Sequence, residues 1–169
     1  RLSWAKGVKQ FCEASDLLRE NYPSVKFLFV GPEDSGSIDS VPLSYIKSYD
    51  DHENFSWIGF RRDVKELYSI SYLAVYPSYY REGGYPRGLT EPMAMGKPVI
   101  TTDSEHCSAA VDDGISGFLV PIKDSVALAE AIKKIITNKS LATSFGKKSR
   151  EKAKNELNES LIIGKLIGE

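Results

Sequence analysis

The feature that most constrains this chain is a regular alternation of short apolar runs with segments of helical period. Val25–Val30 is an apolar run with Lys26 as its one charged residue, closed by Gly31 and Pro32, the pattern of a buried strand. Before it, apolar and small residues recur at helical spacing from Val8 to Leu18. Strands that are joined by helices must run parallel. The alternation therefore predicts an α/β fold with an open, doubly wound parallel sheet.

The same reasoning assigns elements along the rest of the chain. Strands are expected at Val25–Val30, Asn54–Ile58, Tyr72–Tyr76, Pro98–Thr101 and Gly117–Val120. Helices are expected at Gly7–Asn21, from an Asp63 cap to Tyr68, at Arg87–Met95, Glu105–Val111, after an Asp124 cap, at Leu141–Asn155 and at Ser160–Ile167. Residues 32–42 are rich in Ser, Asp, Gly and Pro, which favours a surface loop.

Composition excludes several functional classes. Lys and Arg total 22 against 23 Asp and Glu, so the net charge is −1 and nucleic acid is not an expected partner. Cys12 and Cys107 are far apart and form no metal-ligand spacing, so both are interpreted as ordinary reduced residues and no metal site is predicted. No apolar run approaches the ~20 residues of a membrane helix. His52 and His106 are the only histidines, and both are interpreted as surface or loop residues.

Ligands of doubly wound sheets bind outside the carboxyl ends of the strands. The predicted loops there are 31–37, 59–62, 77–87 and 101–107. The third loop carries glycines and arginines and leads directly into a helix, whose N-terminus offers unpaired N–H groups and partial positive charge. This arrangement suits a diphosphate, whereas composition alone equally fits a loop that needs glycine for its turns. The sequence after Val30 does not match the GxGxxG dinucleotide motif.

Several ordered blocks give the chain a family resemblance. The stretch Glu91–Asp103, which begins Glu-Pro-Met-Ala-Met-Gly, and Asp113–Pro121 closely resemble the family-4 glycosyltransferases of the GT-B fold. The segment from Arg1 to Val8 is similar to the Arg–x4–Lys-Gly opening of their C-terminal domain. Val30-Gly31, Trp57–Arg61 and Val75–Ser78 follow the family's other blocks in order. The resemblance implies the C-terminal, Rossmann-like half of a GT-B fold over residues 1–169.

The resemblance also implies a donor site. Arg1 and Lys6 would hold the diphosphate of a nucleotide-sugar in place of a metal ion, so no metal or other cofactor is expected. Glu82 would contact the donor sugar, and Glu91 would hold the ribose diol. Eight residues separate these glutamates, one more than in the family pattern, and the extra residue falls within 83–87. The remaining binding residues implied near the base, sugar and phosphates are Gly31, Gly59, Phe60, Arg61, Gly83, Gly84, Arg87, Gly88 and Leu89.

The implied activity is retaining transfer of a hexose from a UDP-, GDP- or ADP-sugar to a glycan or lipid-linked acceptor in polysaccharide biosynthesis. The family's acceptor-binding N-terminal domain and its central strand before Arg1 are not within this sequence, so we expect a fragment that is inactive alone. Tyr79, Tyr80 and Tyr85 are expected on its exposed cleft face. The expected location is cytoplasmic, with the parent protein at the inner membrane face. The alternatives are a stand-alone nucleotide-binding module and half of a GT-B nucleotide-sugar epimerase.

Overall fold

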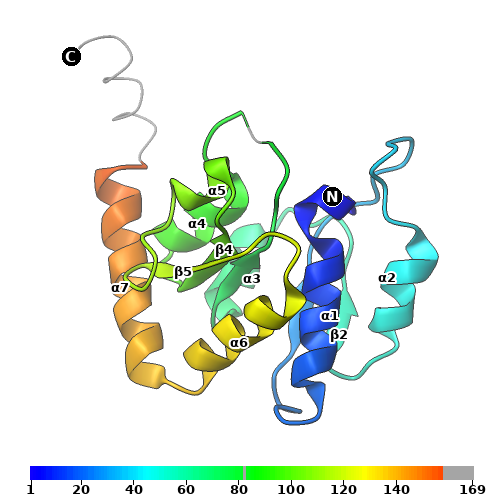
Figure 1. The fold of residues 1–169 in the computed structure, drawn as a ribbon, viewed down its shortest axis with the longest axis horizontal. Helices are drawn as coiled ribbons and strands as arrows, with labels where there is room; N and C mark the ends of the chain where they lie inside the picture. The colour runs from blue at the N-terminus through cyan, green and yellow to red at the C-terminus, as the bar shows by residue number, and fades with distance from the viewer. Residues whose placement is uncertain (82, 158–169) are drawn as a thin grey trace.

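The computed structural model describes residues 1–81 and 83–157 and consists of parallel strands enclosed by helices (Figure 1). The strands are β1 (Phe27–Phe29), β2 (Phe55–Trp57), β3 (Ala74–Tyr76), β4 (Val99–Thr102) and β5 (Gly117–Val120). The helices are the 3-10 helix η1 (Trp4–Lys6) and the α-helices α1 (Val8–Arg19), α2 (Leu43–Asp50), α3 (Val64–Ile70), α4 (Arg87–Ala94), α5 (Glu105–Ser108), α6 (Ser125–Ile136) and α7 (Lys139–Asn155).

Every strand pairing is parallel, and helices connect the strands, which confirms the predicted α/β class. They are paired as two sets: β1 pairs with β2, and β3, β4 and β5 form a three-stranded set in that order. Within the described residues, no hydrogen-bonded strand pairing joins β1 to β3. The expected sheet is therefore present as two parallel ladders. Strand β4, which is paired on both sides, is buried along its whole length.

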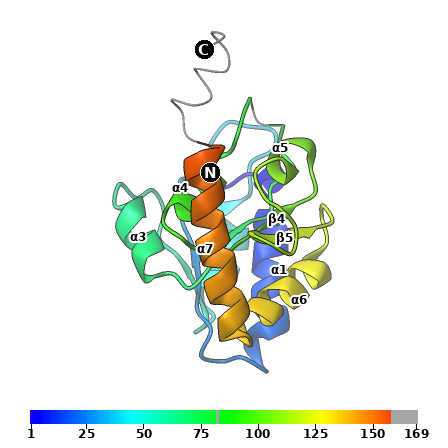
Figure 2. The same ribbon diagram turned by 90° about the vertical axis from the view of Figure 1, so that its left-hand side faces the viewer.

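Helices cover both faces of the strands. In Figure 2, α1 and α6 lie on one side of β4 and β5, and α3 and α4 lie on the other. Helices α1 and α6 pack against the strands through the larger apolar cluster, which includes Phe11, Phe27, Phe55, Ile132 and Ile135. The second cluster packs α4 and α7 against the opposite face and includes Leu89, Met93, Val99 and Ala153. The doubly wound arrangement is confirmed.

Most helix limits agree with the periodic pattern, and one cap does not. Asp124 caps α6, with its carboxylate accepting a hydrogen bond from the Ala127 N–H at 2.8 Å, as predicted. Asp63 occupies the N-cap position of α3 but makes no side-chain cap, so that prediction is wrong. Its carboxylate instead pairs with the Arg61 guanidinium at 2.5 and 2.7 Å. A bidentate charged partner outcompetes the neutral helix N–H groups.

Helix α2 was not predicted. It begins at Leu43, directly after the predicted 32–42 loop, and has no side-chain N-cap. Ile46 is its only fully buried residue. Its inner face is aromatic, with Tyr45 contacting Trp4 at 5.0 Å and Tyr49 contacting Phe55 at 5.9 Å between ring centroids. The Tyr45–Tyr49 spacing of four residues is the signal in the sequence from which this helix could have been predicted. The predicted helix Ser160–Ile167 lies outside the described residues.

The two cysteines lie apart and buried, and neither forms a disulfide. Burial raises the pKa of the Cys12 thiol to about 12, and the nearby Asp16 and Glu13 add to the shift. In the described part of the chain, every helix is too short or too polar to cross a bilayer. The same part gathers no three His, Cys, Asp or Glu side chains in an arrangement suited to a metal ion.

Candidate functional site

The loops at the carboxyl ends of β1, β2 and β3, together with helix α4, contain most of the predicted site residues. The segments that follow β1 and β2 lie side by side, and the Gly31 N–H donates to the Gly59 carbonyl at 2.9 Å. The Trp57 indole donates to the Gly31 carbonyl at 2.9 Å. The predicted pair of glycine turns is therefore brought together, and Gly59 has a left-handed φ of 65°. Phe60, which follows it, is 66% exposed.

The segment 1–6 crosses these ends and meets the loop after β3. Leu2 is fully buried, and its N–H donates to the Pro32 carbonyl at 2.8 Å. The Tyr79 N–H donates to the Ala5 carbonyl at 2.8 Å. Gly7 makes this close contact possible, because a Cβ on it would lie 2.1 Å from the Pro77 carbonyl oxygen. Its φ of 78° also favours glycine.

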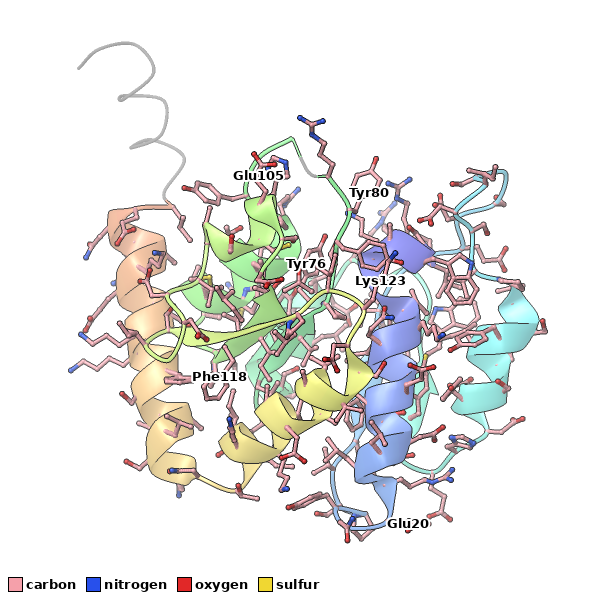
Figure 3. All side chains as sticks on the ribbon, viewed as in Figure 1. Glu20, Tyr76, Tyr80, Glu105, Phe118 and Lys123 are labelled. Atoms are coloured by element: carbon pink, nitrogen blue, oxygen red, sulfur yellow. The ribbon has the colours of Figure 1, made fainter. Side chains whose placement is uncertain are left out.

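Lys6 lies where these segments converge. Its ammonium donates to the Tyr76 hydroxyl at 3.1 Å and lies 4.4 Å from the ring centroid of Tyr80, a cation–π distance. Figure 3 labels both tyrosines. Gly88, in the first turn of α4, packs against the Tyr76 ring, since a Cβ there would approach the ring to 2.7 Å. Lys6, Tyr76 and the start of α4 therefore form one compact group. The two tyrosines were not among the predicted site residues.

The base of the loop after β3 is fixed by hydroxyl groups of β4. Thr101 Oγ1 donates to the Tyr76 carbonyl at 2.7 Å, and Thr102 Oγ1 donates to the Ser78 carbonyl. Ser104 also donates to the Ser78 carbonyl, at 3.3 Å. The tip is open, because Gly83 and Gly84 have no heavy atom within 4 Å of an added Cβ. Glu82 lies outside the described residues.

Helix α4 presents its amino end beside this loop. Pro86 is its N-cap, and its carbonyl accepts from the Leu89 N–H at 2.9 Å, so this cap leaves the N–H groups of Arg87 and Gly88 open. Leu89 is fully buried and anchors the first turn, whereas Arg87 is exposed. The Arg87 guanidinium pairs with Glu91 at 2.9 Å, one turn along the helix. Glu91 faces Tyr68, whose pKa is raised to about 12 by burial and by this carboxylate.

Arg1 and Arg61 lie at the outer rim of the site. The Arg1 guanidinium is 3.3 Å from Asp34 in the predicted surface loop. Arg61 donates hydrogen bonds to the Asp63 carboxylate, and these bonds lower the pKa of Asp63. Tyr80 and Tyr85 are exposed at 42%, as expected, but Tyr79 is half-buried beneath Lys123. His52 and His106 are also half-buried, and His52 Nδ1 lies 3.1 Å from an Asp16 carboxylate oxygen.

A family model matches residues 1–152, and its description is "Glycosyl transferases group 1". Two curated relatives are similar over most of this chain. EpsD of Bacillus subtilis (strain 168), named as a glycosyltransferase, is 30% identical over 90% of the chain and 39% of its own length. A diphospho-undecaprenol N-acetylgalactosaminyltransferase of Campylobacter jejuni is 28% identical over 90% of the chain and 38% of its own length. The chain thus spans about two fifths of the length of these relatives.

Solved structures with the same fold include two informative ones. HepE of Anabaena in complex with UDP superposes with a TM-score of 0.84 at 24% identity, covering 100% of this chain and 47% of that one. The C-terminal domain of the group 1 glycosyl transferase LpcC from Francisella tularensis has a TM-score of 0.77 at 21% identity. It covers 92% of this chain and 82% of that one. The second was solved as a separate domain and still matches nearly the whole fold.

Proposed function

Because this chain belongs to the glycosyl transferases group 1 family, we propose that it binds the nucleotide-sugar donor for retaining transfer of a hexose to a glycan or lipid-linked acceptor. The observation that carries the proposal is the position of Lys6. Its ammonium is held between Tyr76 and Tyr80, next to the first turn of α4. A side-chain cation beside a helix N-terminus favours a diphosphate. HepE, whose fold this chain shares, holds UDP in its solved complex.

In the proposal, each part of the site takes one part of the donor. Lys6 and Arg1 bind the diphosphate, together with the N–H groups at 83–84 and 87–88, while the Leu89 N–H donates to the Pro86 carbonyl. The paired turns at Gly31 and Gly59–Arg61 border the base, and Glu82, outside the described residues, contacts the sugar. Glu91 binds the ribose diol and exchanges its exposed Arg87 partner for the ligand. That exchange costs little because exposed ion pairs contribute about 0–1 kcal/mol.

The chemistry that these residues support is stabilisation of a leaving diphosphate. When the bond between sugar and phosphate breaks, negative charge develops on the phosphate oxygens, and fixed cations and N–H groups stabilise it without reorganising. The proposed residues need no metal ion for this role, because Lys6 and Arg1 supply the positive charge. Family membership favours this transfer over the epimerase alternative.

The proposal includes a partner segment and domain. Residues 1–5 lie across the carboxyl ends between the two strand sets, bonded to Pro32 on one side and Tyr79 on the other. A parallel strand leading into Arg1 would therefore run between β1 and β3 and join the two sets. An acceptor-binding domain preceding that strand would complete the site. Relatives more than twice the length of this chain are consistent with such a domain.

Calorimetric titration of the protein with UDP, GDP and ADP tests the donor site and identifies the base. Lys6→Ala is expected to weaken binding of the preferred nucleoside diphosphate by about ten- to a hundredfold, the effect of losing a charge-assisted contact. The same variant should bind the nucleoside as the unsubstituted protein does. Lys47→Ala, on the exposed face of α2, is the control for loss of charge. Equal losses for diphosphate and nucleoside would show that Lys6 has no phosphate role.

Glu91→Ala tests the opposite end of the ligand. It is expected to weaken both the nucleoside and the diphosphate, because both carry the ribose diol. A 2′,3′-dideoxynucleoside diphosphate should bind the unsubstituted protein and the variant equally. If the variant loses affinity for the dideoxy compound as strongly as for the natural one, Glu91 acts on something other than the diol.

A further inference from the structure

Tyr76, the last residue of β3, is fixed at its backbone and at its ring. Its carbonyl accepts a hydrogen bond from Thr101 Oγ1 at 2.7 Å, on the strand that pairs with β3. Its ring packs against Gly88 in the first turn of α4, where an added Cβ would lie 2.7 Å from the ring carbons Cδ2 and Cε2. The residue therefore has a defined place between β4 and the start of α4.

The hydroxyl group of Tyr76 meets the ammonium of Lys6. The ammonium donates to this hydroxyl at 3.1 Å and lies 5.7 Å from the Tyr76 ring centroid, so it extends beyond the hydroxyl end of the ring and does not lie over the ring face. Tyr80 also contacts the ammonium, with its ring centroid 4.4 Å away, but its side chain is 42% exposed. A lysine side chain has several rotatable bonds, so an acceptor at a fixed place restricts where its charge lies.

The ring of Tyr76 separates two groups that bind anions. The Lys6 ammonium lies at its hydroxyl end, and the first turn of α4 lies against its edge. The cap of α4 leaves the N–H groups of Arg87 and Gly88 open, and N–H groups at a helix start carry partial positive charge. A monophosphate offers one phosphate to this pair of groups, whereas a diphosphate offers one to each.

We propose that Tyr76 is a positioning residue that makes the site selective for a diphosphate. Its hydroxyl orients the Lys6 ammonium, and its ring sets the spacing between that ammonium and the start of α4, so that each group meets one of two linked phosphates. Tyr76 acts on the ligand through Lys6. A cation held in place before the ligand arrives stabilises the charge of the leaving diphosphate without reorganising. This inference rests on the proposed function, in which Lys6 binds the diphosphate.

Tyr76→Phe tests the hydroxyl, because it keeps the ring against Gly88. Calorimetric titrations with UDP, GDP and ADP should show about two- to tenfold weaker binding of the diphosphate that the unsubstituted protein prefers, the effect of one hydrogen bond. The matching nucleoside monophosphate and nucleoside should bind as before, because a single phosphate still meets the N–H groups of α4. Tyr72→Phe, which removes a hydroxyl from a half-exposed tyrosine before β3, is the matched control and should change nothing. Unchanged diphosphate affinity in Tyr76→Phe, or an equal loss for diphosphate and monophosphate, would overturn the proposal.

A double-mutant cycle shows whether Tyr76 acts through Lys6. The cycle compares Tyr76→Phe in the unsubstituted protein with Tyr76→Phe in Lys6→Ala. In the second background the hydroxyl has no ammonium to orient, so it should weaken diphosphate binding by less than about twofold further. A general structural role of the hydroxyl would weaken binding equally in both backgrounds, and that result would overturn the proposal.

A measurement without ligand separates this inference from the proposed function. In protein labelled with ¹³C-lysine, NMR spectra report the CεH₂ group of each lysine, and Lys6→Ala identifies the signal of Lys6. The nearby Tyr80 ring should displace that signal from those of exposed lysines, and Tyr76→Phe should move it back toward them. A Lys6 signal that stays in place in Tyr76→Phe would overturn the positioning role, whatever the protein binds. If the signal moves as expected but UDP, GDP and ADP all fail to bind, the proposed function and the diphosphate selectivity fail, and the positioning of Lys6 by Tyr76 stands.

Discussion

Lys6 illustrates how single residues position the candidate site. Gly7 after it allows the backbone to approach Pro77, and Gly88 allows α4 to approach Tyr76. Both glycines act by lacking a Cβ atom at a close contact, so the lysine and the helix end meet at one tyrosine ring. The sequence predicted Lys6 and Gly88 as site residues through family resemblance, but the packing at Tyr76 depends on the folded chain.

Substituting Gly88 should strain this contact. In Gly88→Ala the new methyl group meets the Tyr76 ring at 2.7 Å, so the ring must move. Overpacking of this kind typically costs about 1–3 kcal/mol of unfolding free energy. Gly84→Ala is the matched control for stability, because nothing lies within 4 Å of its added Cβ. Urea denaturation measures both, and equal stability of the two variants would contradict the packing described.

Cys12 should be chemically inert in the folded protein. Its pKa is raised from 9.0 to about 12, so the thiolate, which is the reactive form, is suppressed at neutral and mildly alkaline pH. The side chain is also fully buried. Incubation with a thiol reagent at pH 8 should leave Cys12 unmodified in the native protein and modify it in urea, as peptide mass spectrometry can follow. Fast native modification would show that α1 opens readily.

At the scale of elements, helix caps show what local sequence can and cannot predict. Asp63 and Asp124 each precede a helix in a similar pattern, yet only Asp124 caps. The difference is Arg61, two residues before Asp63, which captures its carboxylate. Helix α2 was missed for the converse reason, because it forms without a cap and is stabilised by aromatic packing against Trp4 and Phe55. In both cases, contacts with residues outside the helix determined the outcome: Arg61 prevents the cap at Asp63, and Trp4 and Phe55 stabilise α2.

The two aspartates form a natural pair of variants. Asp124→Ala should lower the free energy of unfolding by about 0.5–2 kcal/mol, because the Ala127 N–H loses its partner. Asp63→Ala should have a smaller effect, because it breaks an exposed ion pair and no cap. Thermal or urea unfolding compares them, ideally at low and high salt. A larger loss for Asp63→Ala would mean that its carboxylate caps α3 in solution.

At the scale of the whole molecule, the alternating pattern was sufficient to predict all five strands and both helical layers. Three predicted strands contain the observed one, β5 matches at both ends, and β4 ends at Thr102, one residue after the predicted strand. Local pattern could not predict the pairing of strands into two sets, because pairing depends on which strands lie next to each other. Nor could it predict the hydroxyl groups of Thr101 and Thr102 that fix the loop after β3, since threonine is also an ordinary strand residue.

The last prediction concerns what the chain achieves alone. Catalysis in the proposed mechanism needs an acceptor held against the donor as well as a stabilised leaving group. The residues described here supply only the second, in a site whose loop tip at Gly83–Gly84 is open. We therefore expect this chain to bind a nucleotide and to transfer no sugar, while a longer natural chain containing the proposed upstream strand and acceptor domain transfers it.

Hydrogen exchange and activity, measured on both chains, test this expectation together. In the present chain, the amides of β4 should be protected more strongly than those of β1, because β4 is paired on both sides and β1 only on one. In the longer chain, protection of β1 should rise as the upstream strand joins the two sets. Transfer activity should appear only in that chain, with the same donor and a membrane extract as acceptor. Comparable transfer by the present chain would show that the acceptor site lies within it, and unchanged exchange at β1 would show that no strand is inserted beside it.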